Sequence, residues 1–150
     1  TSVMFIAYAV SGGALLAGQV SLAVWFLPAA ALLQLFIFLT ADGRFSAAGS
    51  TIASATQLGN IGSVRQFEPP HTGSNYLMKE MIHVVGRKHA VKLQVISVVL
   101  LFTPVLLLLL PFSHALALVA VLAHVAGVIV ARWLFFAQAE HVVGLYYAKR

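Results

Sequence analysis

Cysteine is absent from this 150-residue sequence, and charged residues make up only 9% of it. Without cysteine, the chain has no disulfide, no thiolate metal site and no cysteine-ligated iron–sulfur cluster of its own. Soluble domains carry roughly 25% charged residues, whereas 61% of this chain is hydrophobic. A soluble fold has no means of covering so much apolar side chain, so the composition predicts a membrane protein.

The motifs of single-chain enzymes are also missing. The sequence contains no GxSxG, HExxH, P-loop or GxGxxG pattern. A net charge of +5 suggests nucleic-acid binding only where a soluble basic domain carries it, and the sequence has no such domain. In a membrane chain, an excess of Lys and Arg indicates topology instead. We therefore expect no nucleic-acid partner and no metal ligand set.

Long apolar runs dominate the chain and predict helices, since about 20 residues are needed to cross about 30 Å of hydrocarbon. The first run is shorter than this and starts without a charged region, so we expect no signal peptide and a missing N-terminal part. The predicted fold class is all-α: a polytopic transmembrane helix bundle with an additional interfacial amphipathic helix, in one membrane domain over residues 1–150. The expected helices cover residues 3–17, 22–41, 91–110 and 115–147, and the polar loop with its amphipathic segment covers 42–90.

The basic residues indicate which side of the membrane each loop occupies. All nine Lys and Arg residues lie on one side of the predicted bundle or toward it, whereas the opposite turns, around Gly18 and Ser113, carry none. The positive-inside rule places the charged side in the cytoplasm.

Polar chemistry is concentrated in the stretch FEPPHTGSNYLMKEMIHVVGRKHAVKL, residues 67–93. It holds two of the four acidic residues, four of the nine basic residues and three of the six histidines. Glu80, His83 and Arg87 are spaced i, i+3 and i+7, so they share one helix face and are suited to handle protons at a quinone ring. The alternative is a solvated amphipathic helix whose basic residues meet lipid headgroups. The rigid EPPH approach favours a docking face or a site lid.

A second polar group lies in RWLFFAQAEH near the end of the chain. Arg132 and Glu140 are a little over two helical turns apart and share a face, with His141 beside Glu140. Charges at membrane depth are usually buried, paired and often functional. Alternatively, this part of the helix has left the lipid, which Trp133, Tyr146 and Tyr147 support as interfacial anchors.

His124 is the one histidine in the middle of a predicted span. A buried haem needs two axial histidines on facing helices, and the sequence offers His124 no clear partner. A neutral histidine hydrogen-bonded inside the bundle is the better interpretation.

Several motifs resemble a known family. FEPPHTGSNYLMKEM and GRKHAVKL, followed by a Leu-rich span, and RWLFFAQAEHVVGLYY in the last helix resemble the membrane-anchor subunit of dimethyl-sulfoxide-reductase-type molybdoenzymes. TSVMFIAYAVSGGALL is similar to the fifth helix of that family. The resemblance covers essentially the whole chain but only the C-terminal half of the family, about four of eight transmembrane helices.

This resemblance implies an anchor in the bacterial cytoplasmic (inner) membrane that binds and oxidises menaquinol in anaerobic respiration. Electrons would pass to a ferredoxin-like subunit with [4Fe–4S] clusters, and then to a molybdenum-bis(pterin) catalytic subunit that reduces an S- or N-oxide. The anchor itself holds no metal. The polar stretch would lie where the iron–sulfur subunit docks and where quinol protons leave.

The family's catalytic residue is not carried over onto this sequence, so the site residues are hypotheses. The quinol or proton-path candidates are Glu80, His83, Arg87, Arg132, Glu140 and His141. The partner-docking candidates are Glu68, His71, Asn75, Lys79, Lys88 and His89.

Two other functions remain open. One is a purely structural anchor without a redox role, in which the charged residues only contact a partner. The other is half of a secondary transporter, with Arg132 and Glu140 lining a path and Pro104 breaking a helix.

Overall fold

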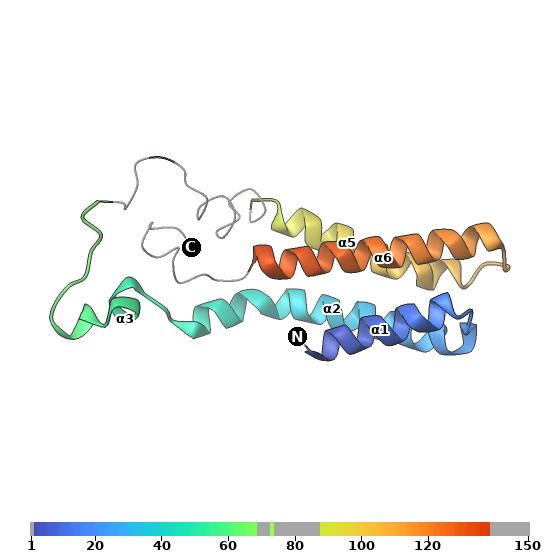
Figure 1. The fold of residues 1–150 in the computed structure, drawn as a ribbon, viewed down its shortest axis with the longest axis horizontal. Helices are drawn as coiled ribbons and strands as arrows, with labels where there is room; N and C mark the ends of the chain where they lie inside the picture. The colour runs from blue at the N-terminus through green and yellow to red at the C-terminus, as the bar shows by residue number, and fades with distance from the viewer. Residues whose placement is uncertain (1, 69–72, 74–87, 139–150) are drawn as a thin grey trace. The chain divides into compact units, whose positions relative to one another are not determined.

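The computed structural model describes residues 2–68, 73 and 88–138, with the backbone alone for residues 42–48. Every regular element in these ranges is helical (Figure 1). The elements are α1 (Ser2–Leu16), α2 (Val20–Ala48), α3 (Ile52–Thr56), the short 3-10 helix η1 (Leu58–Asn60), α5 (Ala90–Leu107) and α6 (His114–Ala137). The expected all-α fold class is therefore confirmed.

The chain divides into two compact units. Residues 1–40 and 91–134 form the first, called here the helical unit, and residues 41–90 and 135–150 form the second, called here the polar unit. Within the helical unit, α1, α2, α5 and α6 lie side by side (Figure 1). A core of residues from all four helices holds them together.

Three helices are long and apolar enough to cross a membrane: Val20–Ala41, Ala90–Leu107 and His114–Ala137. The fourth, α1, has 15 residues and is about 22 Å long, which is less than the hydrocarbon thickness of about 30 Å. The helix starts agree closely with those expected from the apolar runs. α5 continues through Pro104, so the helix break expected of a transporter is not seen there.

A tight turn connects α1 to α2 at the position that the sequence predicts. Gly18 adopts φ +67°, which a residue without a Cβ does at little cost. The amide of Ala17 donates to the carbonyl of Gly13 at 2.9 Å, and the amide of Gln19 donates to the carbonyl of Ala14 at 2.9 Å. These bonds satisfy carbonyl groups at the end of α1.

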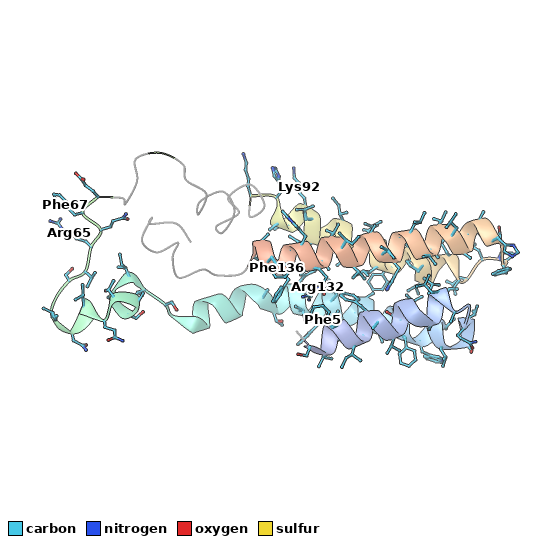
Figure 2. The ribbon with its side chains drawn as sticks, viewed as in Figure 1. Phe5, Arg65, Phe67, Lys92, Arg132 and Phe136 are labelled. Atoms are coloured by element: carbon cyan, nitrogen blue, oxygen red, sulfur yellow. The ribbon has the colours of Figure 1, made fainter. Side chains whose placement is uncertain are left out.

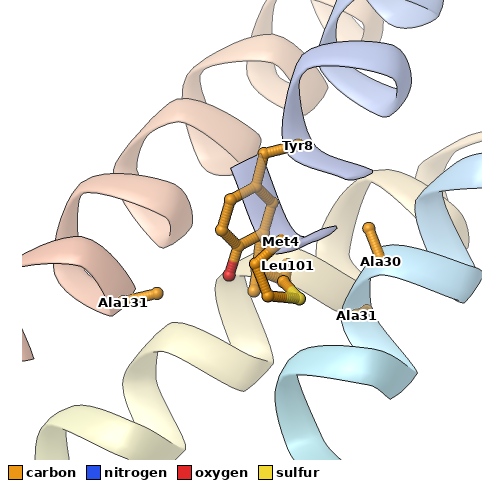
Figure 3. Packing of buried hydrophobic residues seen from close by; sticks show 6 residues of the cluster. All are labelled: Met4, Tyr8, Ala30, Ala31, Leu101 and Ala131. Atoms are coloured by element: carbon orange, nitrogen blue, oxygen red, sulfur yellow. The ribbon is translucent and has the colours of Figure 1, made fainter. Parts of the chain in front are cut away.

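Large apolar side chains face outward in the helical unit, and small ones face inward. Trp25 is 75% exposed and Leu39 is 76% exposed. The core instead contains many alanines, and Figure 3 shows Met4, Tyr8, Ala30, Ala31, Leu101 and Ala131 packed together. Small residues at the interfaces of membrane helices allow close approach and van der Waals packing. The exterior is therefore suited to contact with lipid.

The close contact between α5 and α6 depends on Gly127. A Cβ built on Gly127 would lie 3.0 Å from the Leu101 Cγ and 3.1 Å from the Leu101 amide nitrogen. One turn away on α5, the buried Ser97 hydroxyl donates to the Gly127 carbonyl at 3.0 Å. The missing side chain thus permits both the packing and this interhelical hydrogen bond.

α2 extends further than the sequence predicts. A polar loop was expected from residue 42, but the helix continues to Ala48. Leaving the apolar region does not end a helix, because residues 42–48 contain no proline and include alanines, which favour helix. Gly49 follows the last helical residue with φ +59°, a left-handed conformation that commonly ends helices.

A short capped helix is the regular part of the polar unit that the structure describes. The α3 N-terminus is held by a capping box, in which the Ser54 amide donates to the Thr51 hydroxyl at 3.1 Å and the Thr51 amide donates to the Ser54 hydroxyl at 2.9 Å. The predicted loop or short surface helix is thus a short helix. The amphipathic helix expected from Asn75, and the last helix beyond residue 138, lie outside the described residues.

Two glycine substitutions test the packing of α5 on α6. Gly127→Ala is expected to destabilise the fold by about 1–3 kcal/mol, because its methyl group would overlap backbone and side-chain atoms of α5. Gly13→Ala is the matched control, since a Cβ there meets nothing within 4 Å and alanine favours helix. Thermal unfolding of the full chain in mild detergent measures both. Equal melting temperatures for the two variants would contradict the close contact.

Candidate functional site

The structure describes part of the set of residues predicted from the sequence. Glu68, Lys88, His89 and Arg132 lie within the described residues. The remaining candidates, His71, Asn75, Lys79, Glu80, His83, Arg87, Glu140 and His141, lie outside them. The shared face expected for Glu80, His83 and Arg87, and the pairing of Arg132 with Glu140, therefore remain predictions.

The docking candidates that are described are all exposed. Glu68, Lys88 and His89 belong to the polar unit, and Lys88 and His89 directly precede α5. Their side chains are accessible to solvent, as a docking role requires.

Arg132 is half-buried on α6 and contacts an aromatic ring of α1. Its guanidinium carbon lies 3.8 Å from the centroid of the Phe5 ring, and Figure 2 shows the two side chains together. A cation above an aromatic face is stabilised by about 0.5–2 kcal/mol, more when it is desolvated. Arg132 also acts electrostatically on Tyr8, one turn further along α1. This contact gives the charge a partner within the helical unit.

A buried hydrogen bond joins α1 to α2. The Tyr8 hydroxyl donates to the Gln34 Oε1 at 2.6 Å, and each residue is only 6% exposed. The sequence analysis did not single out either residue. The available signal was Gln34 itself, a lone amide in an apolar span, because polar residues in such spans usually bond across helices.

His124 of α6 lies beside this pair and is 4% exposed. Its ring meets the Tyr8 ring edge-on, with 6.4 Å between centroids and 77° between planes. The Nε2 atom faces α1 at Gly12, where a Cβ would be only 3.0 Å away, and the Tyr8 carbonyl is close enough to accept a hydrogen bond from the ring. The buried Nδ1 atom has no hydrogen-bond partner among the described residues.

These contacts place four kinds of polar group inside one apolar bundle: a guanidinium, a phenol, an amide and an imidazole. Such groups can donate, accept and transfer protons in a medium with little water. Among the described residues, no group of three or more His, Asp or Glu side chains is placed to hold a metal ion. We call Tyr8, Gln34, His124 and Arg132 the polar cluster.

Comparison with known proteins finds a similarity to a redox enzyme. The chain is 35% identical over 89 residues to a membrane-associated relative from Allochromatium vinosum, which is named as one of the subunits of sulfite dehydrogenase. The match covers 57% of this chain and 27% of that protein, so it spans about a quarter of the relative's length. No family model matches the chain, and no solved structure matches it. The chain is thus a membrane protein that is similar to part of an oxidoreductase subunit.

A double-mutant cycle tests the buried hydrogen bond. Tyr8→Phe removes the hydroxyl and leaves the Gln34 carbonyl unpaired, which is expected to cost about 1 kcal/mol. Adding Gln34→Leu removes the unpaired group and should restore part of that loss. Thermal unfolding of the full chain in detergent provides the measurement.

Thr103→Val is the matched control for Tyr8→Phe, because the Thr103 hydroxyl bonds only within its own helix, to the Val99 carbonyl at 2.9 Å. This substitution should change stability less than Tyr8→Phe does. Additive effects of Tyr8→Phe and Gln34→Leu would show that the two side chains do not interact.

Proposed function

We propose that this chain is a membrane subunit of an oxidoreductase complex that exchanges electrons with the quinone pool. The observation that carries this proposal is the 35% identity to a sulfite dehydrogenase subunit. The name of that relative states that it is one subunit of a redox enzyme, and the apolar helices here suit a subunit that holds such an enzyme at the membrane. Menaquinol is the quinol that the family resemblance suggests.

The proposed partners follow from what the chain lacks. It has no cysteine, so electrons need carriers on other subunits to travel beyond the membrane. We assign this role to a ferredoxin-like subunit with [4Fe–4S] clusters and a molybdenum-bis(pterin) catalytic subunit. Exposed Glu68, Lys88 and His89 are the described candidates for contacting the first of these.

The direction of electron flow is the finer question. The resemblance to dimethyl-sulfoxide-reductase anchors favours oxidation of menaquinol, whereas a sulfite dehydrogenase removes electrons from sulfite. Both directions require a quinone site and a route for protons, because a quinone gains two protons when it is fully reduced. The proposed role of the subunit is therefore the same in both cases, and the catalytic partner sets the direction.

Co-purification tests the complex directly. The intact protein is tagged in its native host and extracted in mild detergent, and iron and molybdenum are assayed in the same sample. We expect an iron-rich ferredoxin-like chain and a molybdenum-containing chain to co-purify. A tagged protein that purifies alone and without metal would overturn the proposal and favour the transporter alternative.

A charge reversal then locates the docking surface. Lys88→Glu places a carboxylate where a basic side chain is proposed to contact the partner, so it should reduce the iron recovered per tagged chain. Gln19→Glu adds the same carboxylate at the exposed α1–α2 turn and should leave recovery unchanged. Equal recovery from both variants would remove Lys88 from the docking surface.

Turnover measurements test the predicted proton-path residues. Glu80→Ala, His83→Ala and Arg87→Ala should each slow quinol oxidation with an S- or N-oxide, or quinone reduction with sulfite, on the order of tenfold or more. Assembly should persist in each case. Arg65→Ala, which removes an exposed basic residue outside the candidate set, is the control. Wild-type turnover in all three variants would reject the assignment.

A further inference from the structure

The unpartnered nitrogen of His124 is the feature that packing alone does not explain. The residue is 4% exposed, and its Nδ1 atom is buried without a hydrogen-bond partner in the described part of the chain. Buried polar atoms in native structures almost always have a partner, and an unsatisfied one calls for an explanation such as a water molecule, an ion or a functional role. Leaving such an atom unpaired is also costly.

The surroundings of His124 define which nitrogen is available. Nε2 faces Gly12, and the Tyr8 carbonyl on the same helix can accept a hydrogen bond from the ring. A neutral imidazole has one nitrogen that donates and one that accepts. If Nε2 carries the hydrogen, Nδ1 presents a lone pair to the interior of the bundle. The geometry therefore leaves an acceptor where a proton or an O–H donor can bind.

The polar cluster connects this acceptor to one end of the helical unit. Phe5 contacts Arg132, and Gly12 contacts His124, so α1 and α6 run antiparallel and in register. Tyr8 and its partner Gln34 lie between these two levels. Eight residues of α6 separate His124 from Arg132, which is about 12 Å along the helix axis. Polar groups thus occur at successive depths, with Arg132 nearest the end of the helices and His124 innermost.

We propose that His124 is an intramembrane proton-binding site of this subunit. A hydronium ion that reaches the polar cluster gives its proton to the Nδ1 lone pair, which forms an N–H bond and leaves a water molecule and an imidazolium. The reverse step returns the proton. The proposal rests on the proposed function for its use, since quinone chemistry moves protons, but proton binding itself requires no quinol.

The charged and titratable groups that face His124 in the described structure are few. Tyr8 faces it from α1, and Arg132 lies two turns away on α6. The nearby polar groups of α2 and α5, Gln34 and Ser97, do not titrate. Because Arg132 is positive, it repels an imidazolium formed on the same helix, so a proton bound at His124 is held transiently and can be released.

The competing interpretation is that His124 is a neutral packing residue. Its ring fills the space left by Gly12 and lies edge-on to Tyr8, which would be enough to retain it. A packing residue does not change its protonation state with pH, whereas a proton-binding site does. Infrared difference spectroscopy separates the two interpretations, because protonated and neutral imidazoles absorb at different frequencies.

The experiment compares difference spectra of the intact complex containing isotope-labelled histidine. One spectrum records a change of pH without quinol, and a second records addition of a reduced menaquinol analogue. His124→Gln is compared with His114→Gln, which removes an exposed histidine at the start of α6. We expect protonated-histidine bands in the wild type and in His114→Gln, and loss of one set of these bands in His124→Gln. Unchanged bands in His124→Gln would overturn the proposal.

A second variant keeps the test valid if His124→Gln fails to assemble. Gly12→Ala retains the histidine and places a methyl group 3.0 Å from its Nε2, so it should shift the His124 bands and leave those of exposed histidines in place. Absence of any shift would overturn the proposal. Bands that respond to pH but not to quinol would support the proton site while counting against the quinone function, so the two failures are distinguishable.

Discussion

Inside lipid, every polar group must find its partner within the protein, and this constraint accounts for most of what the helical unit shows. The Tyr8 hydroxyl reaches Gln34 on another helix, and the Ser97 hydroxyl reaches the Gly127 carbonyl. The Thr103 hydroxyl turns back to a carbonyl of its own helix. Against this background, the Nδ1 of His124, which has no partner among the described residues, is conspicuous. An atom that departs from the rule followed by its neighbours is more informative about function than the neighbours are.

Glycines on α1 and α6 make both the packing and the chemistry possible. Gly127 lets α6 approach α5 closely, and Gly12 leaves room for the His124 ring against α1. A larger side chain at Gly12 would displace the imidazole, and one at Gly127 would separate the helices that carry Ser97 and its acceptor. The alanine-rich core acts in the same way, since small side chains bring backbones close enough for polar groups to meet. The geometry of the polar cluster is therefore a consequence of small residues elsewhere in the helices.

The sequence predicts the helices well because apolar runs of membrane length have few alternative structures. It also identifies His124 and Arg132 as unusual. It does not predict that α2 continues to Ala48, because hydropathy reports where lipid ends and not where a helix ends. Nor does it predict that Tyr8 meets Gln34 or that Phe5 meets Arg132. Those pairs depend on the register between helices, which is set by close packing over the whole interface and not by any local pattern.

The two resemblances, to reductase anchors and to part of a dehydrogenase, suggest opposite directions of electron flow, yet they place the same demand on a membrane subunit. Oxidising a quinol releases protons, and reducing a quinone consumes them, so either reaction needs groups that bind protons reversibly at membrane depth. An imidazole near a fixed positive charge suits both directions, because it can accept a proton and is also disposed to release it. The bundle described here is therefore compatible with either class of catalytic partner, and the choice between them lies outside the membrane.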